Sequence, residues 1–193
     1  MKNKLAITAS LKQCSIATRY NDTIYQINEE IDSASCLVEV LKQMFDQYHL
    51  DIHNIDELIT ISGPGSFTGI RTAQSCIKGL EFSLNIQATC VSYFEVIRHL
   101  CECKENLVAI IRSEKNELYF CDFESQQMGI SSVEKLLSIL SQNSTLAGEI
   151  PEEFQYLYKT VSISNFRYAV HLLDINSRSK IIKPLYINAR SNT

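Results

Sequence analysis

Residues 63–69, GPGSFTG, have the residue types and spacing in this sequence best suited to chemistry. Glycines allow positive φ angles and let a ligand approach the backbone closely, while the hydroxyls of Ser66 and Thr68 can donate hydrogen bonds or cap a helix. Between a strand and a helix, such a loop presents backbone N–H groups and the positive end of the helix dipole to an anion. A purely structural turn has the same composition, and spacing alone leaves both interpretations open.

Three well-known signatures do not fit this loop. The Walker A loop ends in Lys followed by Ser or Thr, where this sequence has Ile70 and Arg71. The dinucleotide-binding fingerprint needs a glycine where Thr68 stands, and it belongs to a βαβ unit rather than following a β-meander. The elbow of serine hydrolases needs one residue between the glycine and the serine, but Ser66 directly follows Gly65.

Two further groups have weak metal-ligand spacing. His49 and His53 lie four residues apart, which would place two imidazoles on one helix face, but no third ligand is evident. The pair Cys101 and Cys103 lacks a matching second pair. We therefore expect surface histidines at a helix end and no metal site.

The elements that would hold the loop are predicted by hydrophobic periodicity. Short β-rich stretches predict strands, at residues 4–8, 14–19, 23–28, 58–62 and 88–91. Apolar residues at helical spacing predict helices, at residues 33–49, 68–84 and 92–101. Ser33 or Ser35 would cap the first of these helices.

The second half repeats this order in smaller form. Two strands are predicted at residues 107–112 and 117–123, with a four-residue hairpin between them. A helix from about residue 133, a short helix at residues 166–173 and a last strand at residues 181–187 follow. Pro184 would place the last strand at an edge or a bulge. The polar segment 101–106 predicts a boundary between a first lobe, residues 1–103, and a smaller second lobe, residues 104–193.

Composition limits the classes of function. With 193 residues, 45% hydrophobic and 21% charged, the chain matches ordinary globular proteins. Its formal net charge of −4 disfavours an independent nucleic-acid binder. Residues 167–193 nevertheless carry five cationic side chains and one Asp, which we interpret either as a solvated face or as an edge that meets an acidic partner or RNA phosphate.

Compartment is indicated by the cysteines and the N-terminus. Seven cysteines without a framework spacing fit a reducing cytosol. The N-terminal apolar stretch, residues 5–9, is too short for a secretory signal, and no apolar run reaches the length of a membrane span. We expect a cytoplasmic protein without a membrane partner.

Residues 61–71, ISGPGSFTGIR, resemble the GPGSFTGxR signature of the TsaB (YeaZ) family, bacterial proteins of tRNA threonylcarbamoyladenosine (t6A) biosynthesis. Supporting segments follow in the order that the family has them, namely residues 78–80, residues 91–95, Arg112 with Glu117 and Tyr119, and residues 184–190. The resemblance is strongest over residues 55–120, and the second lobe is shorter than is usual in the family.

The resemblance implies an α/β fold of the actin-like ATPase superfamily (ASKHA), with two ribonuclease-H-like lobes in which helices flank mixed sheets. It also implies a scaffold role. TsaB proteins bind the catalytic paralogue TsaD and, with it, the ATPase TsaE. TsaD transfers threonylcarbamoyl from its adenylate to N6 of the adenosine 3′ of the tRNA anticodon. Contact with tRNA would then be indirect, and a second copy of the chain is the alternative partner when TsaD is absent.

Three residues depart from the pattern of catalytic relatives. Thr8 stands where nucleotide-binding relatives have an acidic residue that organises Mg²⁺ and phosphate. Tyr93 and Ile97 stand where the resemblance places the two metal-binding histidines of TsaD. We therefore expect no catalytic residues, no metal and no cofactor of the chain's own, with ATP bound by the partner subunits.

The resemblance also implies two functional surfaces. The expected binding loop comprises Gly63, Pro64, Gly65, Ser66, Thr68, Gly69 and Arg71. The expected partner interface lies on the first two predicted helices, which pair with those of TsaD as a four-helix bundle in the family, and comprises Leu37, Val38, Leu41, Phe45, Ile70, Ala73 and Ile77. A wide face packed only into the chain's own core explains the same pattern, so this interpretation stays open.

Two alternative functions belong to the same superfamily. An ATPase or phosphotransferase would use residues 63–69 as a phosphate cradle, and Thr8 counts against it. A metallopeptidase would need ligands where Tyr93 and Ile97 stand.

Overall fold

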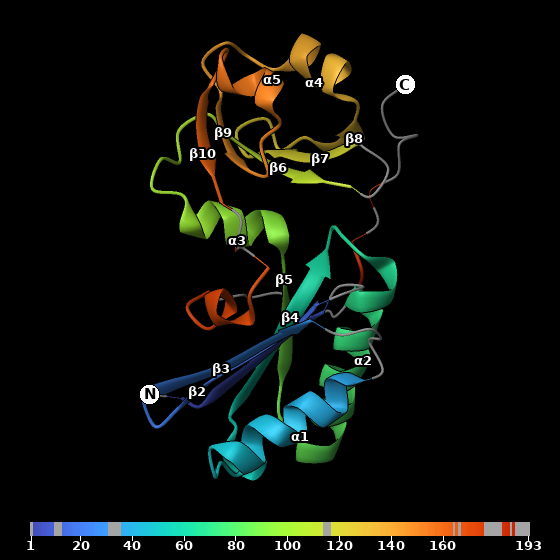
Figure 1. Ribbon diagram of the computed structural model, residues 1–193, viewed down its shortest axis with the longest axis vertical. Helices are drawn as coiled ribbons and strands as arrows, with labels where there is room; N and C mark the ends of the chain where they lie inside the picture. Colours follow the sequence, from blue (N-terminus) through green and yellow to red (C-terminus); the bar gives the residue numbers. More distant parts are fainter. Residues whose placement is uncertain are drawn as a thin grey trace. The chain divides into compact units, whose positions relative to one another are not determined.

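The computed structural model describes residues 2–9, 13–30, 36–113, 117–163, 165, 167–175, 183–185 and 187 (Figure 1). The chain forms two compact units, the first from Met1–Ser92 with Arg167–Leu185 and the second from Tyr93–Phe166 with Tyr186–Thr193. No helix in the described part of the chain combines the length and the apolar character needed to cross a membrane.

The first unit contains a five-stranded mixed sheet. Its strands are β1 (Lys4–Ala9), β2 (Gln13–Tyr20), β3 (Thr23–Glu30), β4 (Glu57–Gly63) and β5 (Ala88–Ser92), in the spatial order β3-β2-β1-β4-β5. The first three strands form an antiparallel meander, and β4 and β5 run parallel to β1. Asn21 and Asp22 turn the β2–β3 hairpin with positive φ angles of 48° and 65°, as a tight two-residue turn requires.

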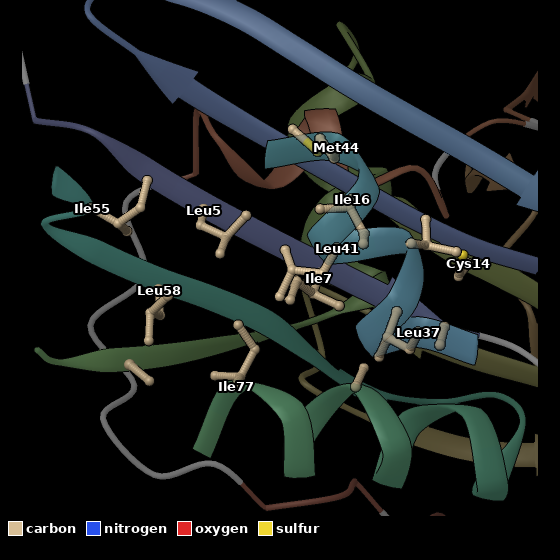
Figure 2. Packing of buried hydrophobic residues seen from close by; sticks show 14 of the residues in the cluster. Leu5, Ile7, Cys14, Ile16, Leu37, Leu41, Met44, Ile55, Leu58 and Ile77 are labelled. Atoms are coloured by element: carbon tan, nitrogen blue, oxygen red, sulfur yellow. The ribbon is translucent and has the colours of Figure 1, made fainter. Parts of the chain in front are cut away.

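Two helices, α1 (Leu37–Gln47) and α2 (Phe67–Leu84), cover one face of this sheet and contact each other. Figure 2 shows Leu5 and Ile7 of β1 packed among side chains of both helices, including Leu41 of α1 and Ile77 of α2. A short 3₁₀ helix, η2 (Ile52–Asn54), precedes β4. Alternation along the strand turns Thr8 of β1 to the opposite face, where the segment containing η3 (Ala169–Leu172) packs.

The second unit repeats the same topology. Its strands are β6 (Leu107–Arg112), β7 (Leu118–Asp122), β8 (Met128–Ser131), β9 (Thr145–Gly148) and β10 (Lys159–Ser162), in the order β10-β9-β6-β7-β8. The strands β6 to β8 are antiparallel, and β9 and β10 run parallel to β6. Helix α3 (Tyr93–Leu100) contacts β6 and β9, whereas α4 (Val133–Ile139) and α5 (Glu152–Gln155) contribute Leu136 and Phe154 to a separate core.

The predicted α/β class with two mixed, helix-flanked sheets is confirmed, and three boundaries differ. Helix α3 belongs to the second unit because it packs on β6 and β9, so the division falls after Ser92 rather than after residue 103. Residues 167–185 return to the first unit. The first predicted helix begins at Leu37, and its expected caps, Ser33 and Ser35, lie outside the described residues.

Other predicted elements were incomplete. The strands β8, β9 and β10 were missed, because each has only four residues and no clear alternation. The predicted helix at residues 166–173 is the four-residue η3, and Phe166 lies outside the described residues. Most of the predicted last strand, residues 181–187, also lies outside them.

Candidate functional site

The glycine loop joins the end of β4 to the start of α2, as predicted. The β4–β5 pairing shifts register between Ile61 and Gly63, so the strand ends in an irregularity. Gly63 and Gly65 have φ angles of 117° and 155°, which side-chain-bearing residues rarely adopt, and the peptide between Gly63 and Pro64 is cis. Pro64 is buried and Gly65 is exposed. The glycines are therefore required by the backbone path.

Three hydrogen bonds fix this loop. The Oγ of Ser66 accepts from the N–H of Gly69 at 3.3 Å, which caps α2. The Nε2 of Gln74, one turn further along α2, donates to the carbonyl oxygen of Ile61 at 2.9 Å. The N–H of Leu185 donates to the carbonyl oxygen of Ser62 at 2.6 Å. The end of β4 is thus held by its own helix and by a segment far along the chain.

The outer side of the loop leads onto an exposed part of α2. Thr68 is exposed, and its carbonyl oxygen accepts a hydrogen bond from the hydroxyl of Thr72 at 3.0 Å. The guanidinium of Arg71 lies 3.8 Å from the centroid of the Phe67 ring, a cation–π arrangement that orients both side chains along the helix surface. The seven residues expected to form the binding loop are therefore adjacent in space, and the anion-binding hypothesis for them stays a prediction.

Thr8, which stands where nucleotide-binding relatives are expected to have a carboxylate, lies near the end of β1. Thr8 is only 3% exposed, and its hydroxyl donates to the carbonyl oxygen of Arg167 at 2.7 Å. Next to it on the same face, the Oγ of Ser15 accepts from the N–H of Ala169 at 2.8 Å. Both hydroxyls tie the sheet to the segment that returns from the end of the second unit.

The positions compared with metal-binding histidines lie in α3. Tyr93 and Ile97 are both buried there, and Ile97 has only a hydrocarbon side chain. His49 and His53 are exposed, on the turn after α1 and in η2, so they are surface histidines as expected. Among the described residues, no group of three or more His, Cys, Asp or Glu side chains is arranged to hold a metal ion.

The expected partner interface needs correction. Six of its seven residues are buried in the first unit's own interior, namely Leu37, Leu41, Phe45, Ile70, Ala73 and Ile77. All of these except Ile70 belong to the core between the two helices and the sheet, and Ile70 lies beside Gly63, so the alternative of a wide core face explains them. Only Val38, which is 61% exposed, faces outward.

The outward side of α2 carries residues that sequence reasoning missed. Phe67 is 53% exposed and Phe82 is 91% exposed. Their positions, together with Arg71, Ser75 and Lys78, recur at three- and four-residue spacing and so lie on one side of the helix. We call this side, with the adjacent Gly79, the outer face of α2. Its signal in the sequence was an aromatic residue, Phe82, placed off the core stripe.

Comparisons with known proteins agree with this architecture. The family model described as TsaD, tRNA N6-adenosine threonylcarbamoyltransferase, matches residues 32–164. The TsaB protein of Buchnera aphidicola subsp. Baizongia pistaciae is 23% identical over 222 residues, covering 98% of this chain and 100% of that protein. The TsaB protein of Haemophilus influenzae is 28% identical over 121 residues, covering 60% of this chain and 51% of that protein.

A solved structure also matches the fold. The YeaZ protein from Pseudomonas aeruginosa superposes with a TM-score of 0.73 at 19% identity, covering 97% of this chain and 100% of that chain. The repeated sheet order of the two units and this likeness confirm the predicted α/β fold with two mixed sheets flanked by helices.

Proposed function

Because the chain belongs to the TsaD family, as a TsaB (YeaZ) member, we propose that it is a non-catalytic subunit that supports t6A formation by binding TsaD. TsaD would carry the chemistry, the transfer of threonylcarbamoyl to N6 of the adenosine 3′ of the anticodon. TsaE would join through the TsaD complex and hydrolyse ATP there. This chain would then act on tRNA only through its partners.

The environment of Thr8 is the observation that carries the non-catalytic part of the proposal. A carboxylate at this position would coordinate a divalent cation and orient phosphate. Thr8 instead offers a neutral hydroxyl, and its proton is donated to the carbonyl oxygen of Arg167. A neutral, internally bonded group holds Mg²⁺ far more weakly than a carboxylate does. The environment of Thr8, at the end of β1 in the first unit, therefore supports a structural role for this residue.

The residues of α3 support the same proposal. A histidine ligand offers a ring nitrogen lone pair to a metal. Ile97 offers no donor atom, and the Tyr93 side chain is buried in the second unit. The positions that correspond to metal ligands in the catalytic paralogue are thus filled by side chains suited to packing.

The outer face of α2 is the surface that we assign to TsaD. Aromatic residues are enriched where proteins bind each other. Phe67 and Phe82 stand at the two ends of the face, and the small residues Ser75 and Gly79 lie between them. A Cβ built on Gly79 would meet no atom within 4 Å, so a partner helix can approach closely there. Arg71 and Lys78 add positive charge that favours an acidic partner surface.

A matched pair of variants tests this assignment. Phe82→Asp places a charge in the proposed interface, and Tyr156→Asp places the same charge at an aromatic residue that is 93% exposed in the second unit. Burying a phenylalanine contributes about 1.5–3 kcal/mol, so loss of Phe82 should weaken TsaD binding by roughly 10- to 100-fold. Isothermal titration calorimetry with TsaD from the same genome measures this, and circular dichroism checks that both variants fold.

Each result has a defined meaning. Weakened binding by Phe82→Asp with unchanged binding by Tyr156→Asp supports the outer face of α2 as the interface. If both variants bind TsaD as tightly as the unaltered chain does, the outer face of α2 is not the interface, but the proposal that the chain binds TsaD still stands. Failure of the unaltered chain to bind TsaD refutes the proposed function itself.

A further inference from the structure

Two cysteines lie close together where α3 leads into β6, within the second unit. The backbone N–H of Cys101 donates to the carbonyl oxygen of Ile97, which extends the helix by one residue. The thiol of Cys101 is buried and donates to the carbonyl oxygen of Cys103 at 3.0 Å. Both thiols are free. The side chain of Cys101 is therefore directed at the backbone of its neighbour two residues on.

The thiol of Cys103 lies against the first residues of two parallel strands. Its Sγ is 3.8 Å from the Oγ1 of Thr145, the first residue of β9. Lys159, the first residue of β10, is the register partner of Thr145, so both side chains start from the same end of adjacent strands. Cys103 is half-buried, so part of this residue is exposed to solvent.

Three donor groups act on this sulfur. The hydroxyl of Thr145, the backbone N–H of Glu105 and the ammonium of Lys159 together lower the pKa of the Cys103 thiol below its ordinary value, and the Thr145 hydrogen bond has the largest effect. Burial acts in the opposite direction on four other cysteines. It raises the pKa of Cys14, Cys76 and Cys101, and it raises the pKa of Cys121 to about 11.

We propose that Cys103 is a peroxide-sensitive modification site, and that Cys101 resolves its oxidised form as an intramolecular disulfide. The geometry that carries this proposal is the contact of the Cys103 sulfur with the Thr145 hydroxyl, the position of Lys159 beside Thr145 in the parallel register, and the second thiol two residues away. This inference is independent of the proposed binding to TsaD.

The chemistry proceeds in two balanced steps. The Cys103 thiolate donates an electron pair to one oxygen of hydrogen peroxide; an S–O bond forms, the O–O bond breaks, and the other oxygen leaves as hydroxide. The product is a sulfenic acid. The Cys101 sulfur then attacks the Cys103 sulfur; an S–S bond forms, the S–O bond breaks, and the hydroxyl leaves as water with the proton of Cys101. The two thiols lose two electrons in total, and peroxide accepts them.

Limited alkylation of the full chain tests the reactivity of Cys103. With substoichiometric iodoacetamide near pH 7.5, peptide mass mapping should show Cys103 labelled at least about five-fold faster than Cys36, although Cys36 is the more exposed thiol. Thr145→Val and Lys159→Gln should each slow labelling of Cys103 several-fold. Thr145→Ser and Lys159→Arg should retain it. Labelling of Cys36 at an equal or higher rate than Cys103 would overturn the proposal.

Peroxide treatment tests the resolving step, with dimedone present to trap sulfenic acid. The unaltered chain should lose two hydrogen atoms in the peptide that contains both cysteines and should take up little dimedone. Cys101→Ser should accumulate the dimedone adduct on Cys103, and Cys103→Ser should form neither product there. Equal trapping on Cys103 with and without Cys101, or a disulfide between two chains, would refute Cys101 as the resolving thiol.

Discussion

The side-chain amide of Gln74 donates a hydrogen bond to the main-chain carbonyl oxygen of Ile61 across 2.9 Å. Gln74 is buried in α2, and Ile61 lies in β4 immediately before the register shift. The bond therefore links the strand that precedes the glycine loop directly to the helix that follows it. It thus holds α2, and with it the outer face of α2, against the end of β4.

Replacing this amide tests how strongly the loop depends on it. Gln74→Met keeps the length of the side chain and leaves the Ile61 carbonyl without its donor, so we expect the free energy of unfolding to fall by about 1–3 kcal/mol. Gln43→Met, on the exposed side of α1, is the control and should change stability by less than about 0.5 kcal/mol. Urea denaturation measures both, and equal stability of the two variants would contradict the role of Gln74.

The backbone path at Gly63 gives a second prediction. A Cβ at Gly63 would lie 3.2 Å from the Cδ1 of Ile70, and the φ angle of 117° is strained for any residue with a side chain. Gly63→Ala should therefore destabilise the first unit by about 1–3 kcal/mol. Gly79→Ala meets open space in α2 and should stabilise it by about 0.5–1 kcal/mol. Thermal unfolding of the two alanine variants should move in opposite directions.

Thr8 gives a third prediction, about the segment that returns to the first sheet. Thr8→Val keeps the shape of the side chain but removes the donor to the Arg167 carbonyl, which should cost about 1–3 kcal/mol. Thr8→Ser retains the hydroxyl and should lose less. Hydrogen exchange should show weaker protection of the Ala169 amide in Thr8→Val, because that amide is held beside Thr8 by Ser15. Equal protection in the two variants would argue against this anchor.

Substitutions at buried and at exposed positions of α2 should have different effects on the free energy of unfolding. Ile77→Ala opens a cavity in the first unit's interior and should lower the free energy of unfolding by about 2–5 kcal/mol. Phe82→Ala removes an exposed ring and should leave stability within about 0.5 kcal/mol. Denaturant titration checks both, and a large loss at Phe82 would mean that this residue serves the chain's own fold.

Periodicity predicted the elements that are long and amphipathic. The stripes of α1 and α2 were read correctly as helices, and the turn between β4 and α2 followed from its glycines. Which face of those helices stays exposed did not follow. Leu37 and Leu41 are as apolar as an interface requires, but the strands of the same unit cover them. Phe82, a single aromatic residue outside the stripe, marked the open side.

Long-range contacts account for what the sequence left undetermined. Thr8 meets Arg167 across 159 positions of the chain, and no local pattern indicates such a partner. The same holds for Cys103, whose neighbours Thr145 and Lys159 come together only because β9 and β10 pair in parallel register. Four-residue strands such as these are defined by their partners more than by their own residues.

Reconstitution of t6A formation tests the proposed division of labour most directly. Purified TsaD and TsaE from the same genome would be given tRNA, ATP and threonylcarbamoyl adenylate, with or without this chain, and the tRNA nucleosides analysed by mass spectrometry. We predict modified adenosine when TsaD and this chain are both present, and neither modified adenosine nor ATP turnover by this chain alone. Modification by the chain alone, or equal modification when it is left out, would contradict the account.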